Sequence, residues 1–246
     1  MLANSCKSDS VGNALIDNGY ICETKYDGTR VWYFTKDNKF INRRGGNVRE
    51  NYPDIQKIGG DYVLDGELCI FTAKKSDFSM LSVREHTQHK FRIELQAEKY
   101  PATFMVFDIC RFEGKDVTSL PLRERKKLLQ KIKLPMGVRL VKETTIKKAR
   151  EEKQEGVMIK DLNSIYEMGK RTDSWIKLKF NKEKEVIFTT YEINTDNSLT
   201  LESENGIRAK CNDIKVKDKM PVTCEVEYLS EYANGKLRFP IIKRVL

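Results

Sequence analysis

The chain has 246 residues, 39% of them hydrophobic, which is enough to bury the core of one or two domains. Its 45 lysines and arginines outnumber 36 acidic residues, and this net charge of +9 favours a polyanionic partner such as nucleic acid. No apolar run is long enough to span a bilayer, and the N-terminus lacks the pattern of a secretory signal, so we expect a cytoplasmic or nuclear protein with no membrane partner.

Strand-forming and helix-forming segments alternate over about the first 180 residues. The predicted strands are short runs rich in β-branched and aromatic residues. The predicted helices carry an apolar stripe or a capping residue at one end. The strands are expected over residues 20–34, 61–71, 103–110, 157–160 and 174–180, and the helices over 119–132 and 144–156.

The character of the chain changes after about Phe180. The charged stretch NKEKE, residues 181–185, indicates a linker. Beyond it, short strand-forming runs are separated by turn signals such as NTDNS and ENG. Five short strands in a segment of this size predict a small β-barrel. They are expected over residues 186–193, 199–204, 207–211, 222–229 and 237–245.

The cysteines and histidines limit the chemistry that the protein can perform. None of the six cysteines forms a C-x-x-C pair, so a zinc site is not expected and the cysteines are predicted to be small buried hydrophobes. The only histidines, His86 and His89, are predicted to lie on a solvated helix face. Histidine general-base chemistry is therefore not expected, and any metal should be a hard ion held by carboxylates and phosphates.

Six short clusters follow one another along the chain. They are KYDGTR (25–30), NRRGG (42–46), LDGEL (64–68), FMVFDI (104–109), EGVMIK (155–160) and WIKLK (175–179). Each is weak alone, but the ordered set resembles the nucleotidyltransferase motifs of ATP-dependent DNA ligases, which RNA ligases and mRNA capping enzymes share more loosely. PLRER, residues 121–125, is also similar to the ligases.

The resemblance covers nearly the whole chain and implies an α+β fold. It implies an antiparallel-sheet nucleotidyltransferase (adenylation) domain over residues 1–181 and a small C-terminal β-barrel, an OB-fold, over residues 182–246. It further implies a minimal ligase without the helical DNA-binding domain that larger relatives carry ahead of the catalytic core. ATP and Mg²⁺, with Mn²⁺ as an alternative, are the implied cofactors. The implied partner is nicked duplex DNA, bound by a monomer.

Lys25 stands beside an Asp-Gly pair, which by itself predicts only a surface hairpin. Within the ligase motifs it matches the catalytic nucleophile that attacks the α-phosphate of ATP. A lysine attacks only as the neutral amine, and its reference pKa is about 10.4, so its surroundings must lower that pKa. Apolar neighbours in VWYF would do so, as would Lys177 and Lys179, which alternate with apolar residues and also match ATP-binding positions.

The resemblance assigns further contacts with the nucleotide. Glu23 matches the residue that contacts the adenine amino group, and Arg30 matches one that contacts the ribose or the phosphate of the nicked strand. Glu67 matches the ribose-binding acid, and Glu155 a carboxylate that binds metal; we expect both to serve as metal ligands. Phe107 matches the aromatic residue that stacks on adenine, although an ordinary core position is a serious alternative.

The resemblance also assigns phosphate and DNA contacts to arginines. Arg171 matches an arginine that contacts the phosphates of ATP. Either Arg43 or Arg44 matches the one that grips the 5′-phosphate of the nick. Arg238 and Arg244 remain from the last motif of the family, whose Asp-Lys pair does not follow here, and we expect them to contact phosphates as well.

Three other functions compete with a DNA ligase. An RNA ligase with the same lysine chemistry is the nearest alternative. A capping guanylyltransferase fits less well, because YDGTR, RRGG and PLRER together are more similar to the DNA enzymes. A non-catalytic nucleic-acid-binding protein with a decayed site is the third, and the presence of every motif up to WIKLK argues against decay.

Overall fold

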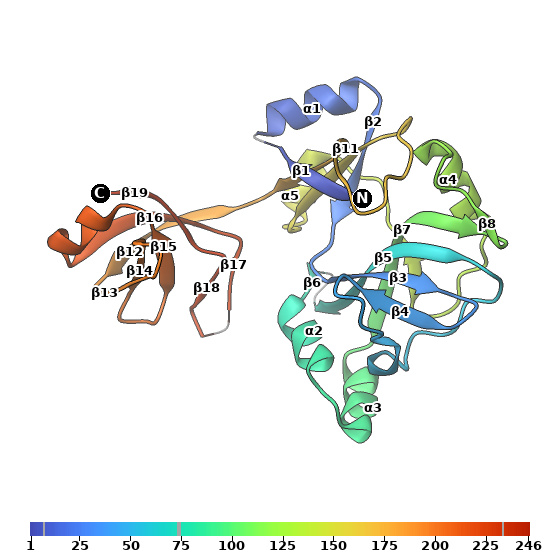
Figure 1. The fold of residues 1–246 in the computed structure, drawn as a ribbon, viewed down its shortest axis with the longest axis horizontal. Coiled ribbons are helices and arrows are strands. Elements are labelled where there is room, and N and C mark those ends of the chain that lie inside the picture. Colours follow the sequence, from blue (N-terminus) through green and yellow to red (C-terminus); the bar gives the residue numbers. More distant parts are fainter. Residues whose placement is uncertain (7, 73–74, 233) are drawn as a thin grey trace. The chain divides into compact units, whose positions relative to one another are not determined.

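The computed structural model describes residues 1–6, 8–72, 75–232 and 234–246 (Figure 1). The chain divides into two compact units, Met1–Leu178 and Lys179–Leu246, called here the larger unit and the smaller unit. The sequence prediction placed the boundary between residues 181 and 182. The predicted linker NKEKE is wrong, because most of it belongs to strand β12 (Lys182–Phe188), which pairs along its whole length with β16 (Val222–Tyr228).

The larger unit contains two sheets, and the predicted strand range 20–34 is divided between them. β2 (Tyr20–Lys25) is an edge of a four-stranded sheet of order β1-β11-β10-β2. β3 (Thr29–Phe34) belongs to a seven-stranded sheet of order β4-β3-β5-β7-β8, with β6 paired to β5 and β9 to β7. The turn between β2 and β3 therefore carries the chain from one sheet to the other. Gly28 is required in this turn, because a Cβ there would collide with the carbonyl oxygen of Leu68.

The remaining strands of the larger unit bring distant segments of the chain together. Most of its strand pairs are antiparallel, whereas β1 with β11 and β7 with β9 are parallel. The bounds are β1 (Leu2–Ser5), β4 (Lys39–Asn42), β5 (Val63–Thr72), β6 (Lys75–Ser76), β7 (Ala102–Phe112), β8 (Lys115–Asp116), β9 (Val138–Leu140), β10 (Gly156–Asp161) and β11 (Arg171–Lys179).

Three helices of the larger unit begin where a side chain satisfies free backbone N–H groups. Ser8, Asp77 and Thr145 accept hydrogen bonds at the starts of α1, α2 and α5. α4 and α5 fall within the predicted helices, and α4 packs against β7 (Figure 1). α1, α2 and α3 were not predicted. Each buries only one or two residues, and α2 and α3 show little apolar periodicity. The bounds are α1 (Asp9–Asp17), α2 (Phe78–Glu85), α3 (Lys90–Lys99), α4 (Leu122–Gln130), α5 (Ile146–Glu151) and a 3₁₀ turn at Arg49–Asn51.

The smaller unit is built from strands, as predicted. Six strands form one sheet of order β12-β16-β19-β15-β14-β13, and β17 pairs with β18. Alternate residues of β12, β14 and β16 point into its core, in which Phe188, Leu201 and Val226 are fully buried. The further bounds are β13 (Thr190–Ile193), β14 (Leu199–Glu202), β15 (Arg208–Cys211), a 3₁₀ helix at Ile214–Lys219, β17 (Ser230–Glu231), β18 (Leu237–Arg238) and β19 (Ile241–Val245).

Most cysteines are buried, as predicted, and the two histidines are solvated but lie at helix ends, whereas a helix face was predicted. All six cysteines are free thiols, and five of them are buried. His86 ends α2 and His89 precedes α3, and both side chains are exposed. Across the described ranges, we find no helix with the length and apolar character needed to cross a membrane.

Candidate active site

The predicted nucleophile lies at the end of β2, and strand register gives it an acidic neighbour. In the antiparallel pair of β2 and β10, Lys25 lies opposite Gly156, so that Glu155 comes alongside it. The Nζ of Lys25 is 2.6 Å from the Oε2 of Glu155. The Lys25 side chain is 21% exposed and the Glu155 side chain 7%, so the amine remains accessible while the carboxylate is nearly covered.

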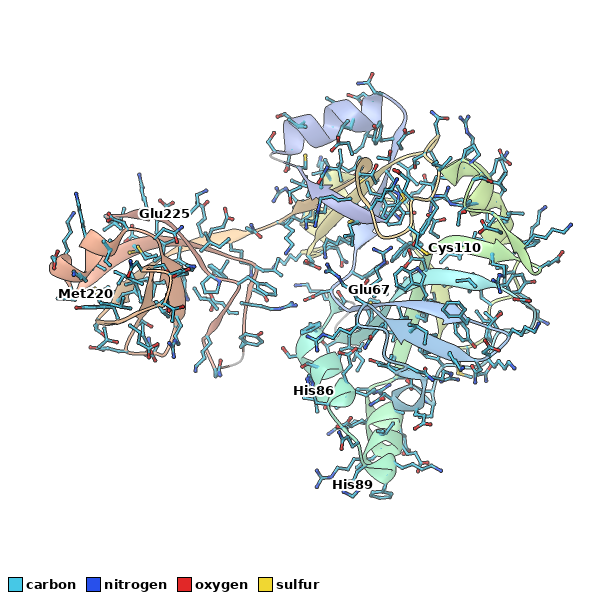
Figure 2. All side chains as sticks on the ribbon, in the orientation of Figure 1. Glu67, His86, His89, Cys110, Met220 and Glu225 are labelled. Atoms are coloured by element: carbon cyan, nitrogen blue, oxygen red, sulfur yellow. The ribbon has the colours of Figure 1, made fainter. Side chains whose placement is uncertain are left out.

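A second carboxylate, Glu67, reaches the same place from the other sheet. Glu67 lies on β5 opposite Arg30 of β3, and Figure 2 labels it within the larger unit. Burial raises the pKa of Glu67 to about 8; Lys25 and Arg30 oppose this shift, and Glu155 adds to it. The turn after β2 thus brings a lysine and two carboxylates together from two sheets.

We expect the raised pKa of Glu67 to make stability depend on pH. In solvent a glutamate has a pKa of 4.5, so between about pH 4.5 and about pH 8 the folded protein binds a proton that the unfolded chain has lost. The free energy of unfolding should therefore fall as the pH rises through this range.

In Glu67→Gln this pH-dependent contribution to stability should disappear, so the variant should gain stability relative to the natural protein as the pH rises. Urea unfolding followed by tryptophan fluorescence at several pH values measures the difference, with the exposed Glu50→Gln as control. A constant difference between Glu67→Gln and the natural protein would contradict the burial of this carboxyl.

Glu23 is buried on β2 between two lysines. Its Oε2 lies 2.6 Å from the Nζ of Lys160 on β10, and its Oε1 pairs with the Nζ of Lys126 on α4. Burial opposes the charged form of Glu23, but the two ammonium groups outweigh it, and the pKa of Glu23 is lowered. Glu23 is therefore an ionised acceptor inside the protein.

Phe107 owes its orientation to an irregularity in the sheet. Asp65 pairs with Asp108 and Gly66 pairs with Val106, so Phe107 is an extra residue on β7, a β-bulge. Its ring is partly buried, with its centroid 5.7 Å from that of Trp175 in an edge-on contact, and the Nζ of Lys160 lies 4.5 Å from the Phe107 centroid. The bulge turns an aromatic ring toward the cations around Glu23.

Arg30 is held by a buried carboxylate. Its Nε and Nη2 donate to the two oxygens of Asp65 at 2.9 and 2.6 Å, and its Nη1 donates to the carbonyl of Met1 at 2.6 Å. Burial opposes the charged guanidinium, but Asp65 outweighs it and raises the pKa of Arg30. The guanidinium also lies 5.4 Å from the centroid of Phe107. Arg30 on β3 thus contacts both Asp65 on β5 and the ring of Phe107 on β7.

The other predicted residues of the larger unit lie near its surface. Arg43 and Arg44 are exposed in a turn after β4, where the Oδ1 of Asn42 accepts hydrogen bonds from the backbone N–H groups of Arg44 and Gly46. Arg171 is exposed at the start of β11, and its Nη1 donates to the carbonyl of Ala3. Lys177 is half-buried on the same strand. That Lys177 and Lys179 act on Lys25 stays a prediction.

Three predicted residues belong to the smaller unit. The Nζ of Lys179 lies 5.4 Å from the ring centroid of Phe239. Arg238 is buried, with 8% of its surface exposed, and its guanidinium lies 5.0 Å from the same ring. Arg244 is exposed on β19, and its Nε lies 2.7 Å from the Oε2 of Glu225.

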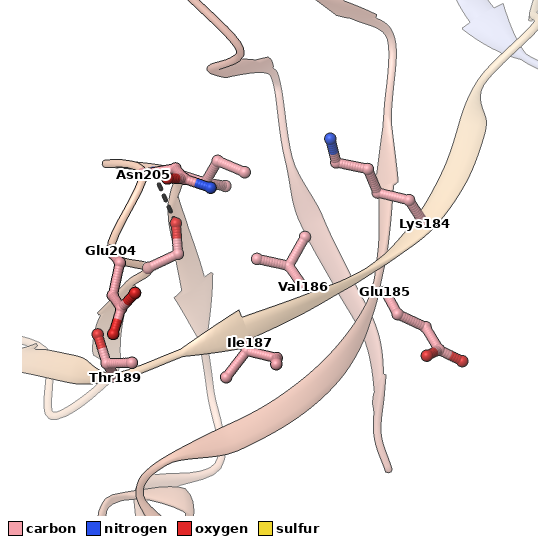
Figure 3. Close-up of a pocket in the computed structure, with 9 residues that line it drawn as sticks. Lys184, Glu185, Val186, Ile187, Thr189, Glu204 and Asn205 are labelled. Atoms are coloured by element: carbon pink, nitrogen blue, oxygen red, sulfur yellow. Dashed lines mark hydrogen bonds between the residues drawn. The ribbon is translucent and has the colours of Figure 1, made fainter.

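A pocket opens on the smaller unit, lined by residues of β12 and of the turn after β14, among them Lys184 and Asn205 (Figure 3). It contains none of the predicted site residues.

Several charged residues around the site received no role from the sequence. Four lie within the quoted motifs, namely Asp65, Asp108, Arg125 and Lys160, and Lys126 directly follows PLRER. Arg125 and Asp108 are fully buried and form a bidentate pair at 2.7 and 2.8 Å. An acid within an apolar strand needs a buried partner, and this rule marks Asp65 and Asp108 as paired. The rule does not identify the cation with which each carboxylate pairs.

The carboxylates around Lys25 fit a magnesium ion better than a metal held by protein alone. Within the described residues, no three His, Cys, Asp or Glu side chains gather into a metal-binding group. Mg²⁺ in nucleotide enzymes is typically bound by one or two carboxylates together with phosphates of the substrate. Glu67 and Glu155, close enough for Glu155 to raise the pKa of Glu67, provide such a pair.

Comparisons with known proteins show the family of the chain. The family model of the ATP dependent DNA ligase domain matches residues 1–179. The DNA ligase of Pyrobaculum islandicum is 29% identical over 208 residues, which cover 77% of this chain and 36% of that protein. The SPbeta prophage-derived DNA ligase-like protein LigB of Bacillus subtilis is 28% identical over 263 residues, 94% of each chain. The chain thus spans about a third of the archaeal relative and nearly all of the Bacillus protein.

Solved structures share the fold of the whole chain. A Lig E DNA ligase, described as binding DNA with a minimal scaffold, superposes with a TM-score of 0.69 at 18% identity, covering 100% of this chain and 98% of that one. The ligase domain of M. tuberculosis LigD gives 0.62 at 18% identity, with 100% and 94% covered. The predicted α+β class, an antiparallel nucleotidyltransferase fold with an OB-fold, is confirmed. Because the family model matches well over half of the sequence, the chain belongs to the ATP-dependent DNA ligase family.

Proposed function

We propose that this protein is an ATP-dependent ligase that seals nicks in duplex DNA through a lysyl-AMP intermediate on Lys25. The observation that carries the proposal is the accessible amine of Lys25, 2.6 Å from Glu155 and beside Glu67. A lysine set among carboxylates at a strand end, within a matched ligase domain, suits covalent nucleotidyl transfer. We further propose that the larger unit is the adenylation domain and the smaller unit the OB-fold domain.

The reaction has three steps. The Nζ of Lys25 forms a bond to the α-phosphorus of ATP as the bond to the pyrophosphate oxygen breaks, and the hydrogen bond to Glu155 gives the departing proton a path. An oxygen of the 5′-phosphate at the nick then takes AMP from Lys25. Finally the 3′-hydroxyl attacks that 5′-phosphate and AMP leaves, which closes the strand. Mg²⁺ would be held by Glu67 and Glu155 and would offset the negative charge of the phosphates.

Three side chains are proposed to hold the nucleoside. Phe107 stacks on adenine, as an aromatic ring on a bulge at the edge of a charged cluster is able to do. Glu23, ionised and buried, accepts a hydrogen bond from the adenine amino group. Glu67, with its raised pKa, contacts the ribose.

Basic residues are proposed to bind the phosphates of ATP and of DNA. Positive charge near polyphosphate and along a DNA backbone contributes most of the affinity for such ligands. Arg30, Arg171, Lys177 and Lys179 are proposed for ATP, and Arg43, Arg44, Arg238 and Arg244 for DNA. A monomer acting on DNA in the cytoplasm or nucleus stays a prediction.

Two measurements test the proposed function. The protein is first incubated with ATP or GTP labelled at the α-phosphate, and covalent label is expected from ATP. The labelled protein is then given a nicked DNA duplex beside matched duplexes with RNA in one strand, and we expect fastest sealing of DNA. Absence of label would contradict the enzyme, and preferred sealing of RNA-containing nicks would support the RNA ligase.

Phe107→Ala should weaken the use of ATP. If the ring stacks on the base, its loss should cost on the order of 1–3 kcal/mol of binding, seen as a raised KM for ATP in adenylylation. Phe112→Ala is a matched control, because Phe112 lies on the same strand, is partly buried and packs with its ring centroid 5.4 Å from that of Tyr62. The control should lose stability only. If Phe107→Ala also loses stability and keeps its KM, then Phe107 is a core residue.

A further inference from the structure

Glu23 has two cationic partners where one would balance its charge. Lys160 and Glu23 are each only 1% exposed, and their side chains lie 2.6 Å apart, which already makes a neutral buried pair. Lys126 adds a second ammonium group on the other oxygen. A second ammonium group at a largely buried site costs free energy unless it also donates to another acceptor. Lys126 therefore calls for an explanation beyond the neutralisation of Glu23.

Exposure distinguishes the two lysines. The Lys126 side chain is 18% exposed, whereas Lys160 lies between the rings of Phe107 and Trp175, with its Nζ 4.5 and 4.2 Å from their centroids. Of these three side chains, only Lys126 reaches solvent to an appreciable degree. Of the two lysines, Lys126 is therefore the one that a base entering from solvent can contact.

The helix that carries Lys126 is fixed in place. Its neighbour Arg125 forms the bidentate pair with Asp108, the residue after Phe107, and donates to the carbonyls of Leu120 and Ser164 at 2.6 and 3.0 Å. The N–H groups of Leu122 and Arg123 donate to the loop after β10. α4 is thus attached both to the strand of Phe107 and to the loop that follows the strand of Lys160, and these bonds hold Lys126 beside Glu23.

We propose that Lys126 determines the specificity of the nucleotide site by donating a hydrogen bond to N1 of adenine while Glu23 accepts one from the adjacent N6 amino group. The inference rests on the proposed function, in which adenine stacks on Phe107. A carboxylate beside an ammonium group presents an acceptor and a donor side by side. The Watson–Crick edge of adenine presents a donor and an acceptor side by side, at N6 and N1, so the two patterns are complementary.

The test measures formation of the covalent nucleotide adduct with ATP and with two analogues of ATP. The first analogue, 1-deaza-ATP, lacks the N1 acceptor. The second, purine riboside triphosphate, lacks the N6 amino group. The natural protein should use both analogues less well than ATP. Lys126→Met should lose about tenfold to a hundredfold in kcat/KM with ATP, the range for a hydrogen bond from a charged group. Lys126→Met should use 1-deaza-ATP about as well as it uses ATP, because it no longer has a donor for N1. It should still use purine riboside triphosphate less well than ATP, because Glu23 remains.

Lys127→Met is the matched control, since Lys127 is the next residue on α4, is exposed, and pairs with Glu124 on the surface. It should behave as the natural protein with all three nucleotides. The proposal is overturned if Lys126→Met keeps the natural preference for ATP over 1-deaza-ATP, or if it loses the same factor with every nucleotide. It is also overturned if the preference for the N6 amino group disappears instead, because Lys126 would then only position Glu23. No adduct from the natural protein would refute the proposed function itself.

Discussion

Lys25→Ala and Lys25→Arg should both fail to form the AMP adduct, with adenylylation reduced by several orders of magnitude. Alanine removes the nucleophile and also leaves the nearly covered carboxylate of Glu155 without its ion-pair partner. Arginine keeps a positive charge beside Glu155 but stays protonated near neutral pH, so it cannot attack phosphorus. The pair of variants therefore separates loss of the nucleophile from loss of charge. The intact mass of the protein after incubation with ATP reports the adduct.

Lys36→Ala, at a surface lysine with 72% of its side chain exposed, serves as the control and should be adenylylated normally. Both Lys25 variants should still seal a nick whose 5′-phosphate already carries AMP, since that step does not use the covalent intermediate. An adduct that survives in either variant would remove Lys25 from the mechanism. Loss of sealing on the pre-adenylated nick as well would point to disturbed folding or DNA binding.

Arg125→Met should lower the free energy of unfolding of the larger unit by about 3–5 kcal/mol, the usual cost of leaving a buried charge unpaired. Arg125 and Asp108 are both 0% exposed, and the substitution leaves the Asp108 carboxylate without its cation. Arg125→Lys should restore only part of the stability, because one ammonium group cannot replace a bidentate guanidinium. Urea unfolding measures the loss, and fluorescence reports the larger unit alone, because the two tryptophans, Trp32 and Trp175, both lie in it.

The neighbouring Arg123 is exposed, and Arg123→Met should change the stability by no more than about 0.5 kcal/mol. A double variant, Arg125→Met with Asp108→Leu, should be more stable than Arg125→Met alone, because it removes the unpaired carboxylate. If Arg125→Met is as stable as the natural protein, the buried pair contributes nothing to folding, and α4 must be held in place by other contacts.

The sequence alone established the order of the motifs and most of the strands. Lys25 was predicted to be the nucleophile from the ordered set of motifs and not from its own six residues, and the strands around residues 63–72, 102–112 and 222–228 follow from runs of β-branched and aromatic side chains. The strands depend on neighbours within a few positions. The pairing of Lys25 with Glu155 was not predicted, because 130 residues separate them and the resemblance implied only that Glu155 binds metal.

The tertiary structure decided which charges meet. Glu23 pairs with Lys126, 103 residues away in the sequence, and Arg30 pairs with Asp65, 35 residues away. Neither pairing can be predicted from local periodicity. The bulge that orients Phe107 depends on the register between two strands, and NKEKE becomes a strand because β16 offers it a hydrogen-bonding partner. A sequence shows which groups need partners, because a buried charge or an open strand edge is costly. The partners themselves are selected by the packing of sheets and helices that lie far apart along the chain.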